Sequence, residues 1–208
     1  MTLDYGKQAT WENGFGTQGS PIALRDGQVV ANEHLQVIAP YHMHQELDDG
    51  TTIKLLGEGQ VQIGAHHYTC VQVHFHVPVE HVSNTAATLE MHFVHQNAIG
   101  QLCVIAVLFK AGAADPILQQ VITDFAAGRQ HPEEIDLTTL MPRRGHVFHY
   151  LGSLTTPPLT EGVEWYVIQP LDLTISKAQA VWFADQFGDN NRALQPRHER
   201  VIEEFDLN

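Results

Sequence analysis

Strict alternation of apolar and polar residues in the middle of the chain predicts β-strands. Residues 71–77 read VQVHFHV, so the apolar side chains, beginning with Val71, are expected on one face of a strand. The polar side chains of Gln72, His74 and His76 then share the other face. Such a strand packs one face against the hydrophobic core and presents polar groups on the opposite face.

Two further strands follow closely along the chain. Residues 88–95 alternate again, with Glu90, His92 and Val94 on one face. The connection before them is short enough to join neighbouring antiparallel strands, and the run QLCVIAVLF predicts a third strand over residues 101–109. Together the three segments predict a β-meander.

Helix signals are clear at two places. Asp115, followed by proline, is suited to the start of a helix whose apolar residues recur at helical spacing as far as Gly128. Ser176 begins a second helix with a capping box that Gln179 completes, and this helix is expected to end near Gly188.

The whole pattern predicts a mainly β (α+β) protein. Residues 149–170 alternate as strands do, and no repeat, low-complexity tract or linker divides the chain. We therefore expect a single domain over residues 1–208. It would be built on a large twisted, mostly antiparallel central sheet with a few peripheral helices.

Composition narrows the classes of function. A formal charge of −13 repels phosphate backbones, so nucleic acid is not an expected partner. No apolar run approaches the roughly 20 residues that cross a bilayer, and the start MTLDYGKQAT lacks the pattern of a secretory signal, so we expect a cytoplasmic protein. Cys70 and Cys103 lie in apolar, strand-like runs and are expected to be buried, reduced thiols.

Three of the fourteen histidines have the spacing of a metal site. His74 and His76 lie on one face of a strand, roughly 6.5–7 Å apart at the backbone, so both rings can reach one ion. His92 lies on the strand expected to pair with the first. Three neutral imidazoles with one open position are the ligands of a catalytic zinc site, so Zn²⁺ is the predicted cofactor. Gln72 and Glu90 share these faces and are suited to accept hydrogen bonds from the ligand rings.

Three longer segments resemble signature segments of α-class carbonic anhydrases of the bacterial type. They are QVHFHVPVEHV from Gln72, LEMHFVHQN from Leu89 and YLGSLTTPPLTEGVEW from Tyr150, with weaker similarity in YGK, SPI and NNRALQP. This family is the standard example of zinc held by three histidines beside an open position. The resemblance implies a zinc lyase, carbonate dehydratase, which reversibly hydrates carbon dioxide to bicarbonate and a proton through zinc-bound hydroxide.

The resemblance also implies a role for each matched residue. The three histidines would hold zinc, with Gln72 and Glu90 as their outer partners. Glu80 would fix Thr155, because a carboxylate only accepts, so the threonine hydroxyl donates to it and is left to accept from the hydroxide. His81 and Tyr150 would belong, with Ser20, to a supporting polar network. The pocket for carbon dioxide would be lined by Val94, Val104, Leu154, Thr156, Val163 and Trp165.

The same resemblance implies which ligands and inhibitors the protein binds. The sequence departs from the family's pattern at two positions. Carbon dioxide and bicarbonate would be the ligands, aromatic sulfonamides the inhibitors, and the protein a monomer or homodimer. Where many relatives read NNGH, this chain reads DDGT, so Thr51 replaces the usual proton-shuttle histidine and proton release is expected to limit turnover. Lys54 stands where the family often has a neutral amide. The alternative proton relays would be His42, His44, Glu46, His66 and His67.

Two other interpretations of the histidines stay open at this point. The spacing of His74, His76 and Glu80 also matches the HxHxxxE core of cupins, which bind iron or manganese, although the expected glycines are absent. A catalytically silent carbonic-anhydrase-like binding domain is the non-enzyme alternative. Such domains lose at least one ligand histidine, and all three are present here.

Overall fold

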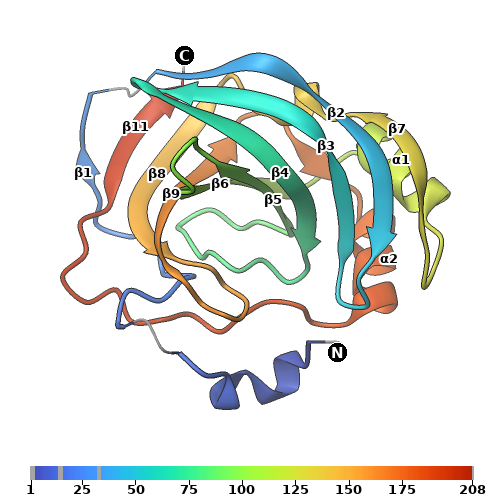
Figure 1. The fold of residues 1–208 in the computed structure, drawn as a ribbon, viewed down its shortest axis with the longest axis horizontal. Helices are drawn as coiled ribbons and strands as arrows, with labels where there is room; N and C mark the ends of the chain where they lie inside the picture. Colours follow the sequence, from blue (N-terminus) through green and yellow to red (C-terminus); the bar gives the residue numbers. More distant parts are fainter. Residues whose placement is uncertain (1–2, 14–15, 32–33, 208) are drawn as a thin grey trace.

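One curved sheet runs through the computed structural model, which describes residues 3–13, 16–31 and 34–207. Its strand order is β1-β11-β8-β9-β6-β5-β4-β3-β2-β7, and β10 pairs with β6. Figure 1 shows this sheet bending around the middle of the molecule, with β1 and β7 at opposite sides of the view. The pairs β1–β11, β6–β9 and β6–β10 are parallel and the other pairs are antiparallel, which confirms the predicted fold class.

The strands are β1 (Gln28–Val29), β2 (Leu35–Asp48), β3 (Ile53–Ile63), β4 (His66–His76), β5 (Leu89–Gln96), β6 (Leu102–Ala111), β7 (Gln130–Asp136), β8 (Gly145–Ser153), β9 (Glu161–Pro170), β10 (Thr174–Ile175) and β11 (Glu203–Leu207). The helices are α1 (Pro116–Asp124) and α2 (Lys177–Phe187), with 3-10 turns η1 (Tyr5–Thr10) and η2 (Thr138–Leu140). Among the described residues, no helix has the length and apolar character needed to span a membrane.

The predicted meander is present as β4, β5 and β6, but its first strand departs from the expected alternation. Val71 was predicted on the core face, and this prediction is wrong, because its side chain is 48% exposed. The register between β4 and β5 shifts between Cys70 and Gln72. Such an irregularity moves the alternation by one residue, so Tyr68 and Cys70 face the core before it and Val73 faces the core after it.

Both predicted helices form, and only the first has a different end. Ser176 caps the start of α2 with the predicted capping box, and the helix is followed by Gly188 at a φ of 67°. α1 ends at Asp124, before Gly128, which lies in the turn that follows. The two helices lie on the same side of the molecule in Figure 1, and the Gln179 side chain joins them through hydrogen bonds to the backbone of Asp115.

Apolar side chains fill both faces of the sheet around β5 and β6. One cluster, which includes Phe93 and Ile105, also contains Phe183 of α2. The other contains Val94 and Val104, which alternate with the first pair along the same strands and therefore lie on the opposite face. The predicted metal ligand His92 points to this second face, away from the helices.

Cys70, Cys103 and His95 are buried in the core. Both cysteines are free thiols, as predicted, and burial raises their pKa values. His95 Nε2 lies 2.7 Å from the Tyr41 hydroxyl. Burial lowers the pKa of His95 from 6.5 to about 4, so the imidazole is neutral in the folded protein at pH 7.

His95 makes stability depend on pH with a defined sign. Between pH 6.5 and about 4, His95 is protonated in the unfolded chain but stays neutral in the folded protein. The free energy of unfolding therefore falls as the pH falls through this window. The shift corresponds to at most about 3 kcal/mol. We predict that His95→Gln reduces the loss of stability between these pH values, measured by urea denaturation of the metal-free protein. The exposed His67→Gln serves as control, and an unchanged pH dependence in His95→Gln would contradict the prediction.

Candidate metal centre

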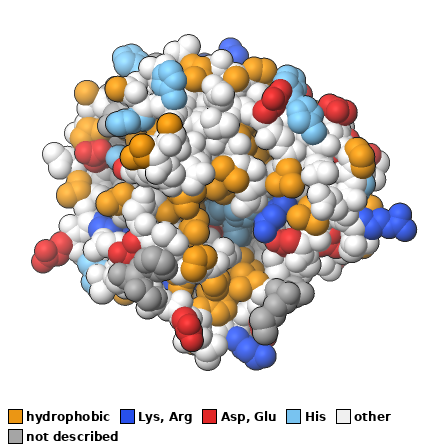
Figure 2. Space-filling model, viewed as in Figure 1, with side chains coloured by type: hydrophobic (Ala, Val, Ile, Leu, Met, Phe, Trp, Pro, Cys, Tyr) orange, Lys and Arg blue, Asp and Glu red, His pale blue; other side chains and the backbone are white. Residues whose placement is uncertain are grey.

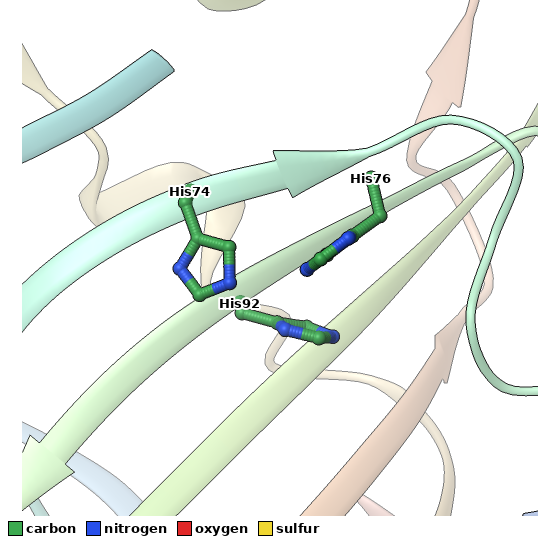
Figure 3. A group of neighbouring side chains, drawn as sticks. All are labelled: His74, His76 and His92. Carbon is green, nitrogen blue, oxygen red and sulfur yellow. The ribbon is translucent and has the colours of Figure 1, made fainter. Parts of the chain in front are cut away.

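The pairing of β4 with β5 brings the three predicted ligands together. His74 lies directly opposite His92, and His76 is two residues further along β4 on the same face. The ring centroids are 4.5–5.0 Å apart, and one nitrogen of each ring lies within 4.8 Å of the others. Figure 3 shows the three rings converging on one point from these two strands. The arrangement is suited to one small cation.

In the rings of His76 and His92, a hydrogen bond to one nitrogen leaves the other nitrogen free to bind a metal. His76 Nδ1 lies 2.7 Å from the Asn190 carbonyl oxygen and donates to it, which leaves the buried Nε2 without a partner. His92 Nε2 lies 2.7 Å from Glu90 Oε1, which leaves Nδ1 facing the other rings. An orphaned, buried nitrogen lone pair that faces two other imidazoles fits a zinc ligand. The residues present therefore fit Zn²⁺.

All three imidazoles are poised as neutral ligands. Burial lowers the pKa of His74, His76 and His92, and the neighbouring rings lower those of His74 and His92 further. A metal binds the neutral form of imidazole. Because these rings are already mostly neutral near pH 7, few protons have to be released when a metal binds. Gln72 lies beside His74, but its Oε1 and the Nδ1 of His74 are both buried without a hydrogen-bond partner.

Glu90 organises the side of the site away from the solvent. Its Oε1 accepts from His81 Nδ1 at 2.6 Å as well as from His92, and its Oε2 accepts from the backbone N–H groups of Glu80 and His81. Burial raises the pKa of Glu90, but His81 and His92 outweigh it and hold this pKa well below its usual range. The result is a buried carboxylate that fixes the His92 ring.

The predicted polar network continues from His81 through Tyr150, a member of the second core cluster, to Ser20. His81 Nε2 lies 2.7 Å from the Tyr150 hydroxyl, which donates to Ser20 Oγ at 2.9 Å. Ser20 is in turn tied to Ser153 at the end of β8. These bonds occupy both ring nitrogens of His81, so the cluster of His81, Glu90 and His92 is a hydrogen-bonded support for the first site.

Glu80 lies beside His76, and Thr155 lies near Glu80. Glu80 Oε1 accepts from the backbone N–H of Arg192 at 2.8 Å, and Oε2 is buried without a partner, 3.7 Å from His76 Nε2. Burial raises the pKa of Glu80. The buried Thr155 is close enough to lower that pKa somewhat, although no hydrogen bond of good geometry reaches Oε2.

An apolar wall stands on one side of the triad. The Trp165 ring centroid is 5.1 Å from that of His92. The residues predicted to hold carbon dioxide gather here, except Thr156, which lines a neighbouring polar cavity with His74 and His76. Four of them are buried members of the second core cluster: Val94, Val104, Val163 and Trp165. The fifth, Leu154, is half-buried and packs against this cluster.

The polar cavity has a volume of about 360 Å³ and leads from the solvent to His74 and His76. Figure 2 shows histidine side chains at the bottom of a central hollow, with a basic side chain at its edge and apolar side chains below. Thr51 and Lys54 line it, and Lys54 Nζ forms an ion pair with Asp49 Oδ2 at 2.7 Å.

The alternative proton relays lie elsewhere. Of the cavity-lining residues that the structure describes, none is among the five residues considered as substitutes for the shuttle histidine. His66 and His67 are exposed at the start of β4, and Glu46 is paired with His131. His42 and His44 belong to β2.

Asn190 is a supporting residue that sequence reasoning missed. Its side-chain Nδ2 donates to the carbonyl oxygens of Thr51 and Phe75, and its Oδ1 accepts from the N–H of Val77. Its own carbonyl oxygen accepts from His76. The available signal was the NNRALQP segment, but no local pattern shows that this loop returns to the end of β4.

We predict that Asn190→Ala weakens zinc binding about 10- to 100-fold and lowers stability by about 2 kcal/mol. The reason is that three backbone groups lose their partner and the loop that orients His76 is released. Competition with a chelator measures the zinc affinity. Asn191→Ala is the matched control, because that side chain makes one long bond of 3.4 Å to Val79. Wild-type zinc affinity in Asn190→Ala would contradict the proposed support.

Comparison with known proteins extends the match to nearly the whole chain. The family model for eukaryotic-type carbonic anhydrase matches residues 6–205. A carbonic anhydrase of Neisseria gonorrhoeae is 38% identical over 151 residues, which cover 70% of this chain and 60% of that protein. One of Pectobacterium carotovorum is 32% identical over 195 residues, which cover 90% of this chain and 80% of that protein.

A solved structure gives the same answer for the fold. The α-carbonic anhydrase of Photobacterium profundum superposes with a TM-score of 0.84 at 30% identity, over 91% of this chain and 90% of that one. The cupin interpretation of the histidine spacing is therefore wrong. The chain belongs to the eukaryotic-type, or α, carbonic anhydrase family of zinc lyases, whose known activity is the hydration of carbon dioxide.

Proposed function

We propose that this chain reversibly hydrates carbon dioxide to bicarbonate and a proton with zinc held by His74, His76 and His92. The observation that carries the proposal is the convergence of three neutral imidazoles beside an apolar wall and an open polar cavity, with the buried Nε2 of His76 left without a hydrogen-bond partner. When bound, zinc supplies a water with a pKa of about 7, for which carbonic anhydrase is the standard example.

The chain's own residues then orient the reacting groups. The Thr155 hydroxyl would donate a hydrogen bond to Glu80, whose carboxylate can only accept, and its oxygen would be left to accept from the attacking hydroxide, directing a hydroxide lone pair towards carbon dioxide. Arg192 keeps the Glu80 carboxylate in place through its backbone N–H. The apolar side chains around Trp165 receive carbon dioxide, a gas without a net dipole moment.

Related structures support an inhibitor class. The α-carbonic anhydrase of Thermovibrio ammonificans, 32% identical with a TM-score of 0.81, was solved with sulfanilamide. Cah3 of Chlamydomonas reinhardtii, 26% identical with a TM-score of 0.83, was solved with acetazolamide. We propose that aromatic sulfonamides also bind this chain. A monomeric or homodimeric state and a cytoplasmic location are further proposals, the latter supported by the free thiols of Cys70 and Cys103.

The direct test combines metal content with hydration rate. The wild-type protein is expected to bind one zinc per chain and to hydrate carbon dioxide in stopped-flow measurements, with inhibition by an aromatic sulfonamide. His92→Ala is expected to lose both zinc and activity, because two imidazoles do not complete the site. The exposed His67→Ala should retain both. A folded wild type that binds no zinc and is inert would favour the silent binding domain instead.

Proton release is expected to limit turnover. Thr51 lines the cavity but does not titrate near neutral pH, and the histidines among the described lining residues are His74 and His76, which are proposed as ligands. We predict that imidazole buffers raise the hydration rate at saturating carbon dioxide. Thr51→His should raise the rate about tenfold or more in a buffer without imidazole, whereas Thr51→Ser should not. A wild-type rate that is already high and independent of buffer would contradict this.

A further inference from the structure

Lys54 is a cation in the wall of a cavity that leads to the proposed metal site. Of the lining residues that the structure describes, it is the only lysine or arginine, and Asp49 is the only acidic residue. The chain as a whole carries a formal charge of −13, so its long-range field repels anions. Attraction of an anion into this cavity therefore has to come from a local group.

Strand pairing determines where this cation lies. Lys54 of β3 is directly opposite His74 of β4. Directly opposed residues of antiparallel strands project from the same face, with Cβ atoms about 4.5–5.5 Å apart. The Lys54 side chain therefore belongs to the same wall of the cavity as the ring of His74.

Asp49 holds the ammonium group and is itself fixed. Its Oδ2 lies 2.7 Å from Lys54 Nζ. Its Oδ1 accepts from the N–H and hydroxyl of Thr51 and from the N–H of Thr52, at 2.9–3.0 Å. An ammonium group has three donors, and Asp49 takes one of them. The Lys54 side chain is 33% exposed, so the remaining donors are accessible from the cavity.

We propose that Lys54, positioned by Asp49, forms an anion subsite on the polar wall that binds a carboxylate-like group lying outside the metal position. The ligand class is carboxylate-like anions, with the product bicarbonate as the natural member on its way out of the cavity. Lys54 is thereby a specificity-determining residue that favours an anionic ligand over a neutral one of the same shape. This inference rests on the proposed function, because the ligand is anchored at the metal.

Two probes of matched shape test the subsite on the zinc-loaded protein. They are 4-sulfamoylbenzoate and 4-sulfamoylbenzamide, whose sulfonamide groups anchor at the metal and whose outer groups are a carboxylate and a neutral amide. Isothermal titration calorimetry gives both affinities. Because the probes also differ in sulfonamide acidity, the ratio of the two affinities is compared between variants.

Measurements on the wild type and three variants separate the effect of the Lys54 charge on the carboxylate preference from the effect of the protein's net charge. Relative to wild type, Lys54→Gln should reduce the carboxylate preference about fivefold, the upper range for a partly exposed charge pair. Lys54→Arg should retain the preference, and so should Lys177→Gln, which removes the same charge from the exposed start of α2. The wild-type preference should also shrink as ionic strength rises.

The outcomes are distinguishable. An unchanged ratio in Lys54→Gln overturns the subsite while leaving the proposed function intact, since both probes still bind. A loss of preference in Lys177→Gln as large as in Lys54→Gln also overturns it, because the effect then reflects net charge. If neither probe binds the zinc-loaded wild type, the proposed function fails and the subsite fails with it.

Discussion

The register between β4 and β5 is the constraint on which the site depends. It places His74 opposite His92 and leaves His76 two residues away on the same face. A slip of one residue would turn His92 to the core face and bring Phe93 to the site. The metal triad and the apolar packing therefore depend on the same strand register. The irregularity next to Gln72 is confined to the start of this pairing and leaves the histidine register intact.

Strand pairing alone does not orient the rings, and hydrogen bonds from the same strand and from a segment distant along the chain complete the site. Glu90 turns the His92 ring, while the carbonyl of Asn190 does the same for His76. Both partners use a buried oxygen to select one ring nitrogen as donor and leave the other free. Zinc ligands need such partners, because they set both the tautomer and the direction of the lone pair.

The sequence predicted those parts of the protein that local periodicity encodes. Alternation identified β5, a continuous apolar run identified β6, capping identified both helix starts, and spacing identified the three histidines. Local periodicity failed at Val71, where a register shift breaks the alternation. It also missed β2, a 14-residue strand with Pro40 inside it and several register shifts. Asn190 was missed because its contacts are tertiary, and the Asp49–Lys54 ion pair because a turn brings it together.

The cavity leads to the predicted metal ligands, and the central claim is that three imidazoles coordinate one zinc ion. X-ray absorption spectroscopy of the zinc-loaded protein tests it most directly. The account predicts three histidine nitrogens and one further light atom from solvent, all at about 2.0–2.1 Å. A shell that contains sulfur, or one with fewer than three imidazoles, would contradict it.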